Sequence, residues 1–246
     1  MVIFLGGSMH IPLILPSTIP PRAHSVGEIA FFGDHERHAV IQILAALQQP
    51  VYLLLFMPTV DDEYGLIIQD FLETFVGLNP NLHLEVYDTQ DDMRLALSFG
   101  IGRLPAILVR NAEGNQTNIR FYGLPSGHTF SSLLDAVLRM GGMASAVLSR
   151  QTTTFLTQLV KPIHIQIFVS ADNPACSSVV VLAHAFAHLS RWIVVDTIEV
   201  RAFPELAESY AVMPTPMVVM NGRVMLMVPG DISEVILLRY MRSLTV

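Results

Sequence analysis

Apolar and polar positions follow one another along this chain in a pattern that predicts the same series of strands and helices twice. Uncharged apolar runs, such as residues 51–57, are typical of buried strands, and apolar residues spaced three and four positions apart are typical of amphipathic helices. In the first half, we expect helices at 34–48, 61–77, 91–99 and 126–140, and strands at 51–57, 82–87, 106–109 and 118–122. In the second half, we expect helices at 174–189, 203–210 and 231–244, and strands at 163–169, 192–200, 217–220 and 223–227. An Asn-Gly pair at residues 221–222 predicts a tight hairpin between the last two strands.

The order strand, helix, strand, helix, strand, strand, helix in both halves predicts an α/β fold with two similar units. Each unit should contain a mixed four-stranded sheet flanked by helices. We place the first unit at residues 34–142 and the second at residues 161–246, with a linking helix over residues 143–160 and an N-terminal arm over residues 1–33.

The N-terminal arm is apolar and rich in proline, whereas disordered tails are usually polar and charged. We therefore expect it to pack, either on its own domain or on a partner protein, and the sequence leaves these two alternatives open. The apolar side chains that would bind in this way are Phe4, Leu5, Ile14, Leu15, Phe31 and Phe32.

The composition changes this picture by indicating partners. Hydrophobic residues make up 52% of the chain and charged residues 14%, against about 25% charged in typical soluble domains. No stretch has the roughly 20 uninterrupted apolar residues of a membrane-spanning helix, and residues 1–21 are broken by prolines and lack the basic start of a signal peptide. We expect a cytoplasmic protein whose apolar excess contacts protein partners in a hetero- or homo-oligomeric assembly. The net charge of −7 argues against a nucleic-acid partner.

The most specific motifs are R-F-Y-G-L-P-S-G-H at residues 120–128, I-G-R-L-P at 101–105 and Y-A-V-M-P-T-P at 210–216. With the strand and helix around Cys176, they resemble the glutaredoxin-like protein disulfide oxidoreductases, which have two thioredoxin-fold units in tandem. The N-terminal domain of the flavoprotein that reduces bacterial peroxiredoxin is a related structure. The resemblance covers about residues 36–245.

This resemblance implies two cis-prolines, Pro105 and Pro216, each beside a redox turn. It also implies that the backbone of the residue before the proline, here Thr215, pairs with an extended substrate. Cis bonds are uncommon, at about 5–6% of such bonds in folded proteins, so the expectation is a specific one.

The chain departs from the family at both redox turns. The first C-x-x-C position falls on residues 62–65, where Asp62 and Gly65 replace the cysteines. The second falls on residues 173–176, where Asn173 replaces the nucleophile and only Cys176 remains. Asp and Asn are good helix N-caps, so these replacements keep the helix start and remove the chemistry. One cysteine cannot form an intrachain disulfide, and dithiol oxidoreductase activity is expected to be absent.

Two interpretations of Cys176 remain open. In the first, the thiol is shielded and inert, as the inner cysteine of the family is. In the second, the helix N-terminus stabilises a reactive thiolate. His184 and His188 have the i, i+4 spacing of metal ligands, but the sequence offers no third ligand. We therefore expect no metal and no cofactor.

The preferred hypothesis is a redox-inactive binding or scaffold protein, either a structural subunit of a larger assembly or a chaperone-like accessory factor. It has no catalytic residue, and the groove at Pro105, Thr215 and Pro216 could still hold an extended peptide. The alternative is a monothiol disulfide oxidoreductase or thiol-transfer enzyme that uses Cys176.

Overall fold

The computed structural model describes residues 31–143, 148–222, 224–227 and 232–245. Its first half contains α1 (Asp34–Leu44), β1 (Val51–Met57), α2 (Glu63–Val76), β2 (Leu82–Asp88), α3 (Thr89–Ser98), β3 (Ala106–Asn111), β4 (Ile119–Tyr122), the 3-10 turn η1 (Gly127–Thr129) and α4 (Phe130–Met140). Its second half contains α5 (Arg150–Gln158), β5 (Ile163–Val169), α6 (Ala175–Leu189), β6 (Ile193–Glu199), α7 (Pro204–Ser209), β7 (Met217–Met220), β8 (Val224–Met227) and α8 (Glu234–Ser243).

The eight strands form one continuous sheet in the order β2-β1-β3-β4-β6-β5-β7-β8. In the first unit β1 is parallel to β2 and antiparallel to β3, and β3 is antiparallel to β4. The second unit repeats this topology with β5, β6, β7 and β8. The units join where β4 pairs in parallel with β6, from Ile119 opposite Val195 to Tyr122 opposite Ile198. The expected α/β fold with two tandem units is therefore confirmed.

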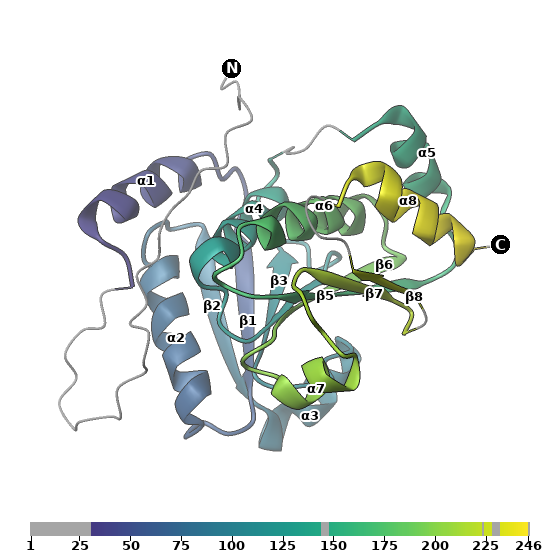
Figure 1. Cartoon of the computed structure of the whole chain (residues 1–246). Helices are drawn as coiled ribbons and strands as arrows, with labels where there is room; N and C mark the ends of the chain where they lie inside the picture. The colour runs from purple at the N-terminus through teal and green to yellow at the C-terminus, as the bar shows by residue number, and fades with distance from the viewer. Residues whose placement is uncertain (1–30, 144–147, 223, 228–231, 246) are drawn as a thin grey trace.

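Helices cover both faces of the sheet (Figure 1). One face carries α2, α4, α6 and α8 over the larger apolar core, and the other carries α3 and α7 over a smaller one. Alternation along the strands produces both cores, since Leu53 and Leu55 point to the larger one and Leu54 and Phe56 to the smaller one. Burial on both faces explains why β1 is apolar throughout.

Two expected helices are shorter in the structure. The segment expected as a helix over residues 126–140 begins with the 3-10 turn and becomes α-helical only at Phe130, because Gly127 has a left-handed φ of +55°. In the described part of the expected linking helix over residues 143–160, the helix is α5, whose start is capped by the Ser149 hydroxyl accepting from the Thr152 N–H at 3.2 Å. In chain order α5 precedes β5 as α1 precedes β1, so the repeat includes this helix.

Phe31 and Phe32 pack within their own chain. They are 3% and 9% exposed, and their rings lie 5.5 and 5.9 Å from the ring of Phe71 on α2. Phe32 also lies 5.3 Å from the ring of Phe130. These two side chains, expected to be part of a partner-binding arm, therefore fill the core of the first unit, because a large aromatic ring gains most by leaving water. The other arm residues, Phe4, Leu5, Ile14 and Leu15, lie outside the described residues.

Among the described residues, no helix combines the length and the apolar character needed to cross a membrane.

Candidate functional site: two redox-type turns without a dithiol

The two turns that the resemblance matches to redox sites lie at the same edge of the sheet. One turn follows β1 and the other follows β5. Strands β1, β4, β6 and β5 all run in the same direction, because β1 and β4 are both antiparallel to β3, and β6 is parallel to both β4 and β5. The carboxyl ends of β1 and β5 therefore open at one edge.

In the first turn, Asp62 acts as the N-cap of α2. Its Oδ2 accepts from the Gly65 N–H at 2.6 Å, so the expected capping role is confirmed. Gly65 is buried, and a Cβ there would lie 2.8 Å from the Met57 sulfur and 2.9 Å from Asp62 Oδ2. This position has no room for a cysteine side chain unless Met57 moves.

In the second turn, Asn173 makes two hydrogen bonds through its side-chain amide. Its Oδ1 accepts from the Ala175 N–H at 3.0 Å, and its Nδ2 donates to the Thr215 carbonyl at 2.6 Å. The helix begins one residue later than the sequence suggests. Pro174 occupies the N-cap with helical φ and ψ, and Asn173 supports the first turn from the position before it. Asn173 thus joins the turn to the loop that leads into β7.

Cys176 is fully buried, at 0% exposure. Burial raises the pKa of its thiol, and hydrogen bonds from the Ser170 backbone and the Thr215 side chain oppose that rise only in part. A buried thiol with a raised pKa is mostly protonated at neutral pH and is a poor nucleophile. This environment favours the interpretation of Cys176 as inert.

The loops beside both turns contain cis-prolines. The Leu104–Pro105 and Thr215–Pro216 bonds are cis, as the resemblance implies, and Met213–Pro214 is also cis, which no motif indicated. Pro105 and Pro216 are buried, Thr215 is half-buried, and Met213 is 84% exposed. The second turn thus faces a loop whose tip is open and whose base is packed.

The loop after β4, residues 123–129, contacts both turns. The Leu124 N–H donates to the Tyr64 hydroxyl at 2.9 Å in the first turn, and the His128 N–H donates to the Ala171 carbonyl at 2.9 Å beside the second. Burial raises the pKa of Tyr64 to about 12, so the phenol stays protonated. This loop carries most of the R-F-Y-G-L-P-S-G-H motif, and its contacts with both turns give those residues a structural role.

Gly123 and Glu199 meet where this loop crosses to the second unit. Gly123 has a φ of +92°, and a Cβ there would lie 2.9 Å from the Ala202 Cβ and 3.1 Å from the Glu199 Cβ. Glu199 is buried, which raises the pKa of its carboxyl, and its Oε2 accepts from the Ala202 N–H at 2.8 Å. Its Oε1 has no hydrogen-bond partner in the described part of the chain. Sequence reasoning did not single out Glu199, because a polar residue at the end of a mostly apolar strand is ordinary.

A charged network that sequence reasoning also missed lies at the β4–β6 junction. The Arg120 Nε donates to Asp196 Oδ1 at 2.5 Å, and its NH1 donates to the Phe99 and Gly100 carbonyls at 3.0 and 2.7 Å. The His164 Nε2 lies 2.6 Å from Asp196 Oδ2. Arg120 and Asp196 are buried, so their charges compensate each other across the two units. The sequence signal that could have indicated this pair is that β4 and β6, both mostly apolar, each contain one of its charged residues, Arg120 in β4 and Asp196 in β6.

His184 and His188 do not form part of a metal site among the described residues. No group of three or more His, Cys, Asp or Glu side chains there could hold an ion. His184 is fully buried against the ring of Phe121, with 5.3 Å between ring centroids. Burial lowers its pKa to about 3, with a smaller effect from the Arg139 charge, so it is a neutral core residue at physiological pH.

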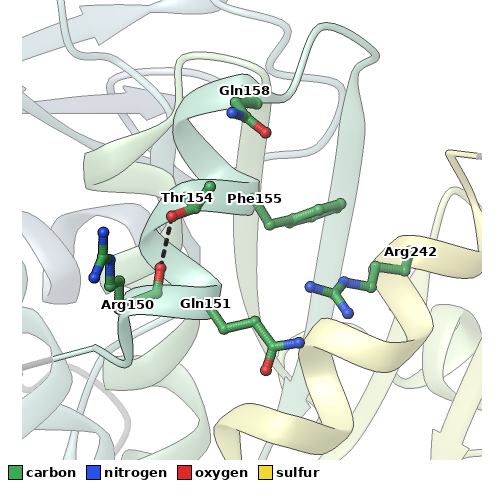
Figure 2. A pocket seen from close by; sticks show the side chains of 6 residues that line it. All are labelled: Arg150, Gln151, Thr154, Phe155, Gln158 and Arg242. Atoms are coloured by element: carbon green, nitrogen blue, oxygen red, sulfur yellow. Dashed lines mark hydrogen bonds between the residues drawn. The ribbon is translucent and has the colours of Figure 1, made fainter.

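A surface hollow of about 510 Å³ lies between α5 and α8, and Figure 2 shows its lining. The Arg242 guanidinium lies 5.7 Å from the centre of the Phe155 ring, and the Gln151 amide points toward it. The lining residues are Arg150, Gln151, Thr154, Phe155, Gln158 and Arg242. None of them belongs to either turn, so the hollow is separate from the candidate site.

Comparison with known proteins agrees with this geometry. The structure of the NTD_N/C domain of alkylhydroperoxide reductase AhpF from Enterococcus faecalis superposes with a TM-score of 0.79 at 29% identity, covering 85% of this chain and 99% of that one. The fold is thioredoxin-like. A protein disulfide oxidoreductase from Aeropyrum pernix superposes with a TM-score of 0.76 at 25% identity, covering 86% of this chain and 93% of that one.

Sequence similarity supports the same relationship. The F subunit of alkyl hydroperoxide reductase from Staphylococcus aureus is 26% identical over 164 residues, which is 65% of this chain and 29% of that protein. The chain thus matches less than a third of the length of this curated relative. No protein-family model matches the chain.

Proposed function

We propose that this thioredoxin-fold chain acts by binding other proteins and not by dithiol exchange. It would serve as a structural subunit or a chaperone-like accessory factor of a larger assembly. The observation that carries this proposal is that side chains which support helix starts, and not exposed thiols, occupy the two turns. Asp62 and Asn173 make helix-start hydrogen bonds at positions where the resemblance places a cysteine, and Cys176 is fully buried.

The chemistry of exchange supports the same proposal. A dithiol enzyme attacks a substrate disulfide with one thiolate and resolves the mixed disulfide with a second thiol. This chain has a single cysteine, so resolution within the chain is impossible. The monothiol alternative needs an accessible thiol with a lowered pKa, whereas burial raises the pKa of Cys176.

Composition supports the partner side of the proposal. Only 14% of the residues are charged, and large apolar side chains such as Val160 and Met213 are exposed, so we propose a cytoplasmic assembly as the setting. The relatives named as a subunit of alkyl hydroperoxide reductase are consistent with work inside an assembly. The identity of the partner is a separate question, which isolation of the complex addresses.

Thiol alkylation tests the redox half of the proposal. In the native protein, we expect iodoacetamide to react with Cys176 at least about tenfold more slowly than in urea-unfolded protein, since both access and thiolate fraction are reduced. The Cys176→Ala variant is the blank. Reduction of a glutathione mixed disulfide by the wild type, lost in Cys176→Ala, would instead establish the monothiol alternative.

Native mass tests the binding half. We expect the protein isolated gently from its source to run well above 27.2 kDa with defined companions. A version that begins just before Phe31 keeps the aromatic residues that fill the core and asks whether the preceding residues hold the companions. A monomer without companions in both forms would refute the subunit proposal.

A further inference from the structure

We propose that the surface hollow between α5 and α8 binds an acidic segment of a partner protein, whose carboxylate side chains pair with Arg150 and Arg242. The inference deepens the proposed function and rests on it, because it names the chemistry that the partner presents. The hollow has a volume of about 510 Å³, and the two arginines are its charged lining residues. Figure 2 shows Arg242 on α8 facing the side chains of α5.

The Arg242 guanidinium is held by two neighbours on α5. It lies 5.7 Å from the centre of the Phe155 ring. A guanidinium has only donors, so the Gln151 amide atom that faces it must be the oxygen, which accepts from NH1 and NH2 at 3.1 Å each. Three of its five N–H donors, the Nε–H among them, therefore have no acceptor in the described part of the chain. These donors are sufficient to hold a carboxylate by two hydrogen bonds.

The two helices offer no carboxylate that could neutralise these arginines. Glu234 is the only acidic residue of α5 and α8, and its Oε1 accepts from the Ser149 N–H at 3.0 Å and from the Ser149 hydroxyl at 2.6 Å. Within the described residues, neither Arg150 nor Arg242 forms an ion pair. The whole chain has a net charge of −7, so a hollow with only positive charges is an exception on its surface. Charge complementarity indicates an acidic partner.

The position of Arg150 supports a role in binding and not in folding. It is the first residue of α5, where the helix end is itself positive and a further positive charge is unfavourable. Ser149 already caps this helix, and the Arg150 side chain is exposed. An anion bound in the hollow would compensate both the arginine and the helix end.

The openness of the hollow favours a segment of a protein chain over a small enclosed ligand. Five of the six lining side chains are exposed, and only the Phe155 ring is half-buried. Sites for small molecules usually bury most of the ligand, which this surface cannot do. Contacts at the ends of the helices also hold the hollow in shape, since the Lys161 Nζ donates to the Thr245 carbonyl at 2.8 Å just beyond α8. A preformed site lowers the entropic cost of binding.

The experiment uses the full chain and a rhodamine-labelled octapeptide of alternating glutamate and serine as the probe. We expect fluorescence anisotropy to show binding that weakens at least about threefold in Arg242→Gln, and at least about tenfold when Arg150→Gln is added, because charge-assisted hydrogen bonds are lost. Arg94 is exposed on α3, over the other face of the sheet. Arg94→Gln removes the same charge and should leave the affinity within about twofold of the wild type.

The control peptide has glutamine in place of glutamate. Absence of binding of the glutamate peptide to the wild type, equal binding of the glutamine peptide, or an equal loss in Arg94→Gln and Arg242→Gln would each overturn the proposal. Inorganic phosphate that binds the hollow more tightly than the peptide does, measured by competition, would assign it to a phosphate-bearing ligand and would also overturn it.

These outcomes are distinguishable from failure of the proposed function. Both arginines are exposed, so we expect their variants to fold, and circular dichroism checks this. Companions in the native-mass experiment can be held by other surfaces. Loss of the peptide result with companions retained would therefore refute the assignment of the hollow and leave the subunit proposal standing.

Discussion

Asp62 and Asn173 show at the scale of single residues how a side chain holds the start of a helix at a turn where the resemblance places a cysteine. An α-helix leaves its first backbone N–H groups without partners, and a side-chain oxygen at the start satisfies one of them. Asp62 does so for Gly65 and Asn173 for Ala175. A thiol is a weak acceptor, so aspartate and asparagine suit these helix starts better than cysteine would.

Replacement of Asp62 by cysteine should therefore destabilise the protein. We expect Asp62→Cys to lower the free energy of unfolding by about 1 kcal/mol, as loss of an N-cap does, while Asp62→Asn changes it little. Urea denaturation measures both. The neighbouring exposed Asp61, changed to cysteine, is the matched control. If Asp61→Cys and Asp62→Cys cost the same, capping is not the reason for the aspartate.

His184 should make stability depend on pH. The unfolded histidine binds a proton below about pH 6.5, whereas the folded one, with its pKa lowered to about 3 by burial, does not until much lower pH. Between these values the unfolded state binds more protons, so stability is present above pH 6.5 and is lost as the pH falls toward 3. His188 has a lowered pKa for the same first cause and acts in the same direction.

We expect His184→Phe to flatten this part of the profile of unfolding free energy against pH between 6.5 and 4. The measurement is urea unfolding at a series of pH values. His35 is exposed on α1, and His35→Phe is the matched surface control. A slope that His184→Phe and His35→Phe change equally would contradict the assignment.

At the scale of elements, the sequence predicts the bounds of strands better than it predicts which strands pair. The bounds of β1, β5 and β7 match the expected ranges, because β1 and β7 are uninterrupted apolar runs and β5 is apolar except for His164 and Gln166. The hairpin at residues 221–222 is present, with φ of +50° at Asn221 and +65° at Gly222, since those residue types favour that turn. Pairing of β4 with β6 could not be predicted, because it joins two units through tertiary packing that leaves no local pattern.

The candidate site also has a part that could be predicted from the sequence and a part that could not. The turn residues Asp62, Asn173 and Cys176 could be found from the resemblance, and capping by Asp62 follows from local chemistry. The Asn173–Thr215 hydrogen bond joins positions 42 apart in the chain, and no propensity encodes such a contact. The expected helix over residues 143–160 was too long because apolar composition alone does not mark where a helix begins.

The Arg120–Asp196 pair should be the most sensitive polar contact at the β4–β6 junction. We expect Asp196→Ala to cost about 3–5 kcal/mol of unfolding free energy, because it leaves a buried guanidinium without its partner. The double variant Arg120→Met, Asp196→Leu should cost clearly less than the sum of the single changes. The comparison pair is Arg110–Glu85, which is partly exposed, and Glu85→Ala should cost at most about 1 kcal/mol. Additive single and double effects at Arg120 and Asp196 would show that the two charges are not coupled.

At the scale of the whole molecule, the junction makes two similar units into one structure. The sheet runs without a break through β4 and β6, and the buried Arg120–Asp196 pair spans the same seam. Helices α4 and α6 lie side by side over it (Figure 1). A unit separated at this seam would expose a strand edge and an apolar helix face to water. Each unit is therefore stabilised by the other, which two independent domains on a linker would not be.

This arrangement predicts that the chain unfolds in one cooperative transition, and the position of its single tryptophan makes the prediction easy to test. Trp192 immediately precedes β6 in the second unit, and Phe71 is fully buried in the first. Phe71→Ala removes core contacts worth about 3–5 kcal/mol, and Phe71→Leu is a milder change should the first variant fail to fold. In a cooperative molecule the damage to the first unit must shift the Trp192 fluorescence transition and the far-UV circular dichroism transition by the same amount. A Trp192 transition that stays at its wild-type midpoint while the circular dichroism splits in two would show that the units unfold separately, and that the continuous sheet does not couple them.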